Sequence, residues 1–292
     1  MNQASGSITT KETILVTGAT GNIGRAVLAS LQAAGANVIA GSRAGNAVDG
    51  VSGRKVDFND PTQLAGAFKG VDRLFLVFPL ESNKIALATN AISAAKAAGV
   101  KFIVRSSGAG ADAQSPVALA KLQGTVDQLV MNSGVPYSLL LPNSFMQNWI
   151  NYYGGMIKAG ALYLSHGDGK ISSVDVRDIA DVAAAILLNP DAHNGKSYTL
   201  TGPQALSAHE CLAQIAKASG RVAQYVAVPE AASIEAMKNM GMDDWSIDML
   251  SSLNQIIAAG YAAGITTDVE TVTGKPARTF SAFAHDHANA WD

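Results

Sequence analysis

The chain has 292 residues, of which 48% are hydrophobic and 15% are charged, and its formal net charge is −2. This length is sufficient to bury the core of one large α/β domain with a small second lobe. A nearly neutral chain lacks the basic field of a nucleic-acid-binding protein, so we expect no nucleic-acid partner.

The sequence also bears on cellular location. No stretch reaches the apolar length needed to cross a bilayer, so we expect no membrane partner. Met1 to Thr10 lacks the apolar segment of a secretory signal, and we expect these residues to be disordered. The single Cys211 rules out an intramolecular disulfide, and its Ala- and Leu-rich surroundings favour a buried structural thiol. These features together predict a cytoplasmic protein.

A glycine-rich turn follows the first predicted strand, the apolar run 13–16, and apolar residues then recur at helical spacing. Gly18 would permit the tight turn, Gly21 would let a pyrophosphate approach the backbone, and Gly24 would let the helix pack on the strand. The N-terminus of that helix favours phosphate charge. The spacing is Gly-x-x-Gly-x-x-Gly, and its strand-to-helix context predicts a dinucleotide site.

The end of the second predicted strand indicates which nucleotide binds. Ser42 and Arg43 follow strand 37–40, and no acidic residue appears before Asp49. In NAD-binding folds an acidic residue in this region binds the ribose hydroxyls, whereas an arginine accommodates a 2′-phosphate. A hydroxyl and a guanidinium suit a phosphate, so we predict NADP(H) in preference to NAD(H). The alternative is that Arg43 is a solvated loop arginine.

The remaining pattern is that of an α/β protein with a Rossmann-like, doubly wound parallel sheet and a small C-terminal substrate lobe. Further strands are predicted near 55–58 and over 73–78, 101–105, 137–142, 197–201 and 225–229. Helices are predicted over 60–68, 85–98, 118–131, 174–188, 207–218, 231–240 and 245–261. We expect a Rossmann domain of residues 11–145 plus about 172–202, and a lobe of residues 146–171 plus 203–292 that covers the carboxyl edge of the sheet. The sequence sets no oligomeric state.

With these elements in place, the chain resembles the atypical short-chain dehydrogenase/reductases of the NmrA-like family. The resemblance covers nearly the whole chain and rests on residues 17–24, 141–148, 174–181, 198–203 and 272–280. It implies NADPH bound between a Rossmann-like domain and a C-terminal lobe, as in family members that reduce quinones, azo dyes and triphenylmethane dyes.

The resemblance also implies cofactor contacts. The pyrophosphate would lie against Gly18, Thr20, Gly21, Asn22, Ile23 and Gly24. The adenosine phosphate and adenine would meet Ser42, Arg43, Asp57 and Phe58, and the nicotinamide half would meet Val77, Phe78, Pro79, Ser106, Ser107 and Lys121. Asp57 could equally be a turn residue, the two serines helix-cap or turn residues, and Lys121 a helix-surface lysine.

The proton donor of the standard short-chain dehydrogenases is absent. These enzymes use Tyr-x-x-x-Lys, but the residue four positions before Lys121 is Val117. Without a matched acid, hydride delivery to a simple ketone develops an unstabilised alkoxide. Conjugated acceptors spread the incoming charge, and binding geometry then supplies most of the acceleration. We therefore predict a reductase of planar conjugated molecules, with Lys121, Ser106 and Asn143 as catalytic candidates.

Candidate substrate contacts lie mainly after the sixth strand: Phe78, Asn143, Phe145, Met146, Trp149, Tyr152 and His166. Aromatic residues at such mixed spacing are also typical of a lobe core. His166 could donate a proton, although a lone loop histidine more often lies at the surface. Asp175, Asp178 and Asp181 are interpreted as a helix start and its solvated face, and we predict no metal site.

Two functions remain open at this point. The aromatic segment 143–153 favours an NADPH-dependent reductase. The missing tyrosine leaves a redox-sensing NADP(H)-binding regulator without turnover as the alternative. A nucleotide-sugar epimerase or dehydratase shares the glycine motif but needs that tyrosine.

Overall fold

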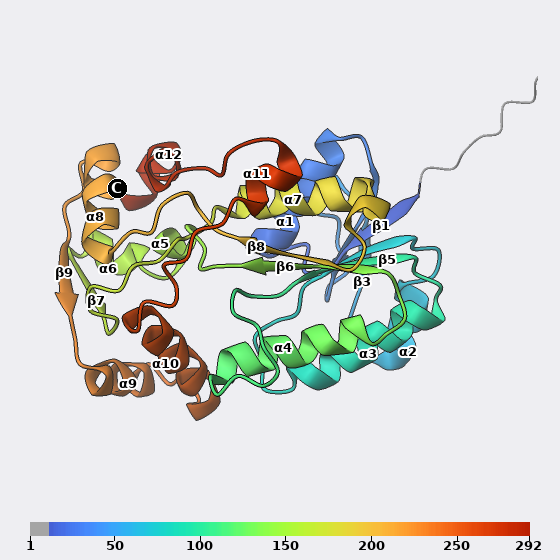
Figure 1. The fold of residues 1–292 in the computed structure, drawn as a ribbon, viewed down its shortest axis with the longest axis horizontal. Coiled ribbons are helices and arrows are strands. Elements are labelled where there is room, and N and C mark those ends of the chain that lie inside the picture. The colour runs from blue at the N-terminus through green and yellow to red at the C-terminus, as the bar shows by residue number, and fades with distance from the viewer. Residues whose placement is uncertain (1–11) are drawn as a thin grey trace, which may run out of the picture.

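Two parallel sheets organise the computed structural model, which describes residues 12–292 (Figure 1). The larger sheet has seven strands in the order β3-β2-β1-β4-β5-β6-β8, and the smaller pairs β7 with β9. The strands are β1 (Thr13–Val16), β2 (Asn37–Ser42), β3 (Gly53–Lys55), β4 (Arg73–Leu76), β5 (Phe102–Ser106), β6 (Tyr137–Pro142), β7 (Ala161–Leu164), β8 (Lys196–Leu200) and β9 (Gln224–Ala227). The predicted α/β class is confirmed. The expectation for residues 1–10 lies outside the described residues.

Helices cover both faces of the larger sheet. Figure 1 shows one layer formed by α1 (Asn22–Ala33), α7 (Val176–Leu188) and α11 (Asp268–Thr273), and an opposite layer formed by α2 (Pro61–Ala67), α3 (Lys84–Ala97) and α4 (Ala118–Met131). The other helices are α5 (Asn148–Asn151), α6 (Gly154–Lys158), α8 (Ala208–Ser219), α9 (Glu230–Asn239), α10 (Asp244–Ala258) and α12 (Phe280–Asp286), with short 3₁₀ turns at Pro190–His193 and Ala288–Trp291. Across residues 12–292, no helix combines the length and the apolar character that spanning a membrane requires.

Local sequence sets several helix ends. Asp60 accepts hydrogen bonds from two backbone N–H groups in the first turn of α2, and Pro61 occupies the first helical position. Ser207 and Glu210 form a reciprocal capping box at the start of α8, which ends at Gly220 with φ of 76°. These signals are local, and the predicted helices at both places are confirmed.

Apolar side chains of β1 alternate between two cores. Ile14 and Val16 pack on the side of α1 and α7, whereas Leu15 packs on the side of α2, α3 and α4. This alternation follows from the pleat of a strand, and burial of both faces explains why the sequence reads as continuously apolar. A third core lies in the lobe and includes Trp149 and Trp291.

The part of the chain after β6 departs from the prediction. The strand β7 and the helices α11 and α12 were not predicted, and α11 packs on α7 and β8. Val269 of α11 belongs to the core of the larger sheet, although its segment was placed in the lobe. The division into two domains stays a prediction, and α11 packs with the helices and strands of the larger sheet.

The prediction of a solvated acidic face on α7 was wrong. Asp175 does cap the helix, because its carboxylate accepts a hydrogen bond from the Arg177 N–H. Asp178, however, is only 2% exposed. It accepts a hydrogen bond from the Arg278 N–H at 2.8 Å and forms an ion pair with the guanidinium of that residue. The partner lies far away along the chain, so no local pattern could have indicated it.

Candidate functional site

The glycine turn lies between β1 and α1, next to the point where the strand order reverses between β1 and β4. Gly18 has φ of 61°, and a Cβ there would lie 2.6 Å from Val77 Cγ1. The Thr17 hydroxyl donates to the Phe75 carbonyl and accepts from the Val77 N–H, both at 3.0 Å. The Gly21 N–H donates to the Gly18 carbonyl at 2.9 Å. These bonds hold the turn against the end of β4.

The first turn of α1 is suited to an anion. Gly21 is its N-cap and supplies no side-chain cap, and no acidic side chain lies in the first turn. A Cβ on Gly24 would lie 2.6 Å from the Gly18 carbonyl carbon, so the helix packs directly on the backbone of the turn. The N–H groups at the start of the helix therefore lie at the cavity wall, where they are available to an anion.

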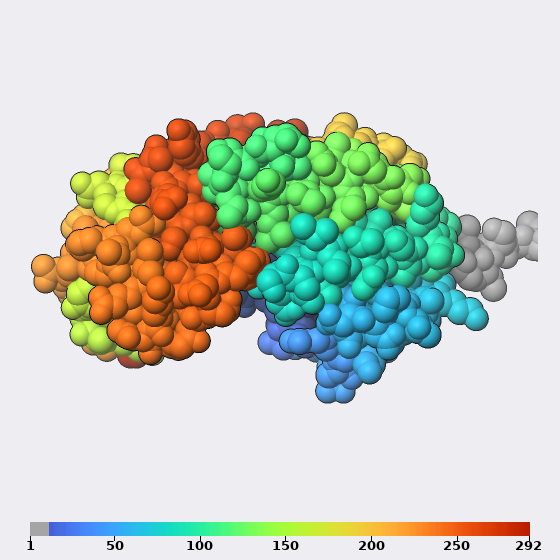
Figure 2. Space-filling view, turned by 90° about the horizontal axis from the view of Figure 1, so that it is seen from below, coloured from blue at the N-terminus to red at the C-terminus, as the bar shows by residue number. Residues whose placement is uncertain are grey.

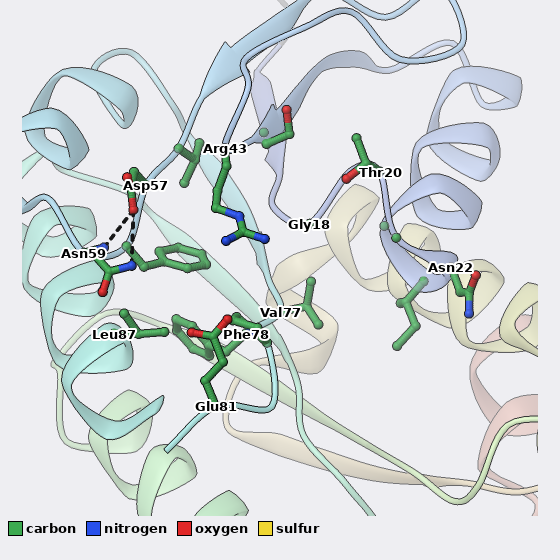
Figure 3. Close-up of a pocket in the computed structure, with 18 of the residues that line it drawn as sticks. Gly18, Thr20, Asn22, Arg43, Asp57, Asn59, Val77, Phe78, Glu81 and Leu87 are labelled. Carbon is green, nitrogen blue, oxygen red and sulfur yellow. Dashed lines mark hydrogen bonds between the residues drawn. The ribbon is translucent and has the colours of Figure 1, made fainter. Parts of the chain in front are cut away.

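A cavity of about 370 Å³ opens in front of this turn (Figure 3). Its size falls within the range of small-molecule sites, roughly 300–1,000 Å³. Figure 2 shows the surface hollowed between the C-terminal lobe, in orange, and the first part of the chain, in blue and cyan. The cavity is lined by Gly18, Thr20, Gly21, Asn22, Ile23, Gly24, Gly41, Ser42, Arg43, Val56, Asp57, Phe58, Asn59, Val77, Phe78, Pro79, Glu81, Leu87 and Phe145.

One end of the cavity combines an aromatic wall with a cation. The rings of Phe58 and Phe78 lie 4.9 Å apart between centroids at an angle of 54°. The guanidinium of Arg43 points into the cavity from the loop after β2 (Figure 3). Arg43 has no hydrogen bond or ion pair with any residue of the described chain, so it is free to bind a phosphate. The Asp57 carboxylate instead accepts hydrogen bonds from Asn59.

The predicted cofactor contacts line this cavity, with the exception of Ser106, Ser107 and Lys121. The sequence reasoning missed Gly41, Val56, Asn59, Glu81 and Leu87. Four of these five residues lie within two positions of a predicted contact near a strand end, which is the signal that could have identified them. Leu87 lies in α3, away from the predicted contacts. The roles of the individual residues stay predictions.

The three predicted contacts outside the cavity have other neighbours. Ser107 is buried, and its hydroxyl donates to Asp127 Oδ2 at 2.5 Å. The carbonyl of Ser106 accepts a hydrogen bond from the guanidinium of Arg105. Lys121 is exposed on α4, which agrees with the alternative of a helix-surface lysine.

A buried charge cluster lies behind Phe78. Arg105 Nε is 3.0 Å from Asp127 Oδ1, and both Arg105 and Lys84 donate to Gln123 Oε1, at 2.7 and 3.1 Å. The Arg105 guanidinium carbon is 5.9 Å from the Phe78 ring centroid. Burial, followed by the like charge of Arg105, lowers the pKa of Lys84 to about 7, while Asp127 opposes this shift. Burial also lowers the pKa of Arg105 to about 10 and raises that of Asp127.

The predicted substrate contacts fall into separate places. Phe78 and Phe145 line the cavity. Met146 and Trp149 are buried in the lobe core, and Trp149 packs edge-on against Phe280 at 5.4 Å. Tyr152 is 73% exposed. The mixed aromatic spacing after β6 therefore reflects mostly the packing of the lobe.

Asn143 connects the end of β6 to the lobe. Its amide nitrogen donates to Ser172 Oγ and to the Ala262 carbonyl, both at 2.8 Å. Its side-chain oxygen accepts from the Ser144 N–H at 2.8 Å. These bonds use both N–H groups of the amide and one acceptor position of its oxygen, and Asn143 does not line the cavity.

His166 is buried, with 2% of its surface exposed, rather than lying at the surface as a lone loop histidine usually does. Within residues 12–292, neither ring nitrogen finds a hydrogen-bond partner. Burial lowers the pKa of the imidazole, which favours the neutral ring. The residue does not line the cavity.

Side chains that can ligate a metal, and the single cysteine, are the other reactive groups of the chain. Among the residues that the structure describes, no group of three or more His, Cys, Asp or Glu is placed to hold a metal ion. Cys211 is buried, as predicted, and burial raises the pKa of its thiol. A thiol with a raised pKa is a poor nucleophile, so the structural interpretation of Cys211 holds.

Comparison with known proteins agrees with this architecture. A protein named NAD(P)H azoreductase from Xenophilus azovorans is 39% identical over 284 residues, which are 95% of this chain and 99% of the relative. The structure of an NADPH-dependent quinone oxidoreductase from Escherichia coli, complexed with NADPH, has a TM-score of 0.82 at 30% identity and covers 94% of this chain and 99% of its own. The Citrobacter sp. triphenylmethane reductase complexed with NADP(H) has a TM-score of 0.80 at 26% identity, with the same coverage.

The family follows from the sequence match as well as from the fold. The model of the NmrA-like family matches residues 10–275, which is most of the chain. Its N-terminal part contains the glycine turn, and its remainder includes the strands that carry the cavity. The chain belongs to the NmrA-like family.

Proposed function

We propose that this chain is an NADPH-dependent reductase that delivers hydride to a planar conjugated small molecule. A quinone, an azo or triarylmethane dye and an activated alkene all fit this class. The observation that carries the proposal is a single cavity lined by the glycine turn, by an aromatic wall and by Arg43, which has no partner among residues 12–292. Three of the proteins that are similar over nearly the whole chain are named for azo, quinone and triphenylmethane compounds, which share extended conjugation.

The residues of the cavity fit such a cofactor. The glycine turn and the start of α1 offer N–H groups to the pyrophosphate, Arg43 offers a guanidinium to the 2′-phosphate, and Phe58 offers a ring face to the adenine. The reduced nicotinamide supplies the hydride when it is bound. Phe145 lies in the same cavity and provides apolar surface for a flat acceptor.

The surroundings favour an acceptor that needs no protein acid. Val117 stands where the standard tyrosine would be, Lys121 is exposed on α4, and both amide N–H groups of Asn143 donate to other residues of the chain. A conjugated acceptor delocalises the negative charge it receives, so solvent can protonate the product afterwards. The chain then accelerates the reaction by holding the acceptor in place.

The test is NADPH oxidation by the purified protein, followed by absorbance with a panel of quinones, azo dyes, triarylmethane dyes and enones. We expect NADPH to be consumed with at least one conjugated acceptor and not with a simple aliphatic ketone as the control. Equal rates with the ketone would contradict the proposed chemistry. Tight NADPH binding without turnover across the panel would instead identify an NADP(H)-sensing regulator.

We further propose that NADPH is preferred over NADH because of Arg43. Replacing Arg43 with alanine should weaken NADPH binding by about 10- to 100-fold, since charge-assisted hydrogen bonds contribute roughly 1.5–3 kcal/mol. NADH affinity should change less than about threefold. Arg43→Lys should lie between the two, because an ammonium keeps the charge but loses the planar fork. Calorimetric titration with each cofactor measures these values, and equal losses for both cofactors would refute the role of Arg43.

We also propose that the protein works in the cytoplasm without a nucleic-acid partner. Cys211 is a free buried thiol, which suits a reducing compartment. The net charge of −2 gives the chain no net positive field that would attract a polyanion. Fractionation of cells and measurement of nucleic acid in the purified protein test the two statements.

A further inference from the structure

Glu81 is a second charge in the cavity that has no partner among residues 12–292, and it lies on the wall opposite Arg43 (Figure 3). Glu81 lies in the loop between β4 and α3, is half-buried, and lines the same cavity as Arg43. Figure 3 shows the Arg43 guanidinium and the Glu81 carboxylate reaching into this space from different segments. No ion pair joins them in the described chain.

Glu81 differs from the other carboxylate of the cavity. The Asp57 carboxylate accepts hydrogen bonds from the Asn59 N–H at 3.0 Å and from the Asn59 amide at 3.4 Å, which is a local turn. The Glu81 carboxylate has no hydrogen-bond partner among residues 12–292, and only its backbone carbonyl accepts a bond. A carboxylate that stabilises no protein contact in this cavity is placed to act on a ligand.

The loop that carries Glu81 is anchored on its C-terminal side. The Glu81 carbonyl accepts a hydrogen bond from the Lys84 N–H at 3.0 Å. Lys84 is itself buried, and its ammonium donates to Gln123 Oε1 at 3.1 Å. Pro79 restricts the backbone on the N-terminal side. The backbone that carries the Glu81 side chain is therefore held at the cavity on both sides.

We propose that Glu81 is a specificity-determining residue that limits the preference of this site for NADPH over NADH. This inference rests on the proposed function, in which Arg43 binds the 2′-phosphate. That phosphate carries about −1.5 to −2 charges, and a carboxylate in the same cavity repels it. The 2′-hydroxyl of NADH carries no charge and can donate a hydrogen bond to a carboxylate. Arg43 and Glu81 thus act in opposite directions on a ligand in the same cavity, and the chain accepts both cofactors.

The test uses Glu81→Gln, which keeps the shape of the side chain and removes its charge. Affinities for 2′,5′-ADP and for ADP are measured by calorimetry, so neither nicotinamide nor an acceptor is needed. We expect the ratio of 2′,5′-ADP affinity to ADP affinity to rise about fivefold or more in Glu81→Gln. Glu81→Asp should keep a ratio close to that of the unmodified protein. The rise should shrink as salt is increased, because the Debye length falls from about 10 Å at 0.1 M to about 3 Å at 1 M.

The matched control is Glu235→Gln on α9, which makes the same change of charge at an exposed residue that does not line the cavity. Its affinity ratio should equal that of the unmodified protein. An unchanged ratio in Glu81→Gln, or the same shift in Glu235→Gln, would overturn the inference.

The failure of this inference and the failure of the proposed function give different results. A shifted ratio in a protein that turns over no acceptor supports the role of Glu81 and contradicts the reductase. An unchanged ratio in a protein that reduces quinones or dyes overturns only the role of Glu81. Equal affinities for 2′,5′-ADP and ADP in the unmodified protein and also in Glu81→Gln would overturn the roles of Arg43 and Glu81 together.

Discussion

Gly24→Ala is expected to lower the affinity for NADPH at least about tenfold and to destabilise the fold by about 1–3 kcal/mol. The added Cβ would lie 2.6 Å from the Gly18 carbonyl carbon and closer still to the Gly18 oxygen. Both are backbone atoms of the glycine turn, so no side chain can rotate away to relieve the overlap. The helix α1 must move off the turn, and the N–H groups proposed to bind the pyrophosphate then lose their alignment. Calorimetric NADPH titration and denaturant unfolding measure the two effects.

The control for this substitution is Gly66→Ala in α2. A Cβ at Gly66 meets no heavy atom within 4 Å, and Gly66 lies inside a helix. Alanine should therefore stabilise the fold by about 0.5–1 kcal/mol through helix propensity and leave NADPH affinity unchanged. NADPH affinity in Gly24→Ala equal to that in Gly66→Ala would show that the contact between α1 and the turn is not needed for binding.

Asp127→Ala is expected to destabilise the fold by about 3–5 kcal/mol, because it leaves buried cations without their counter-charge. The Arg105 side chain is fully buried and lies 3.0 Å from the Asp127 carboxylate. Lys84 shares Gln123 with Arg105, so two cationic groups meet in one apolar region. The hydroxyl of Ser107 also loses its acceptor. Urea unfolding at pH 7 measures the loss.

An exposed ion pair provides the comparison for Asp127. Lys170 and Glu210 lie 3.1 Å apart with about half of each side chain in solvent, and Lys170→Ala should cost about 0–1 kcal/mol. The double variant Asp127→Ala with Arg105→Met should lose less than the sum of the two single variants, because it removes a buried pair rather than one partner. Additive losses, or equal losses in Asp127→Ala and Lys170→Ala, would show that the buried charges do not interact as the geometry indicates.

Several elements were predictable from local sequence. The predicted helix 118–131 and the predicted strand 137–142 have the observed bounds of α4 and β6, because apolar periodicity and flanking turn residues are encoded within each segment. The glycine turn was equally accessible, since Gly18 needs a positive φ and Gly24 needs a close helix contact. The alternation of strands and helices in the chain predicts a doubly wound parallel sheet, whereas the order of its strands is decided only in the folded structure.

The pairing of distant charges was not accessible in this way. The local sequence predicts Asp178 to be a solvated helix residue. In the structure it is buried and pairs with Arg278 from the segment after α11. Arg105 and Asp127 lie on different elements of the chain. The role proposed for Glu81 depends on Arg43 lining the same cavity, which the local sequence around Glu81 does not indicate. Periodicity and backbone constraints act over a few residues and are written in the local sequence. The burial and partner of a charge depend on which remote segments pack beside it, and that information exists only in the folded arrangement.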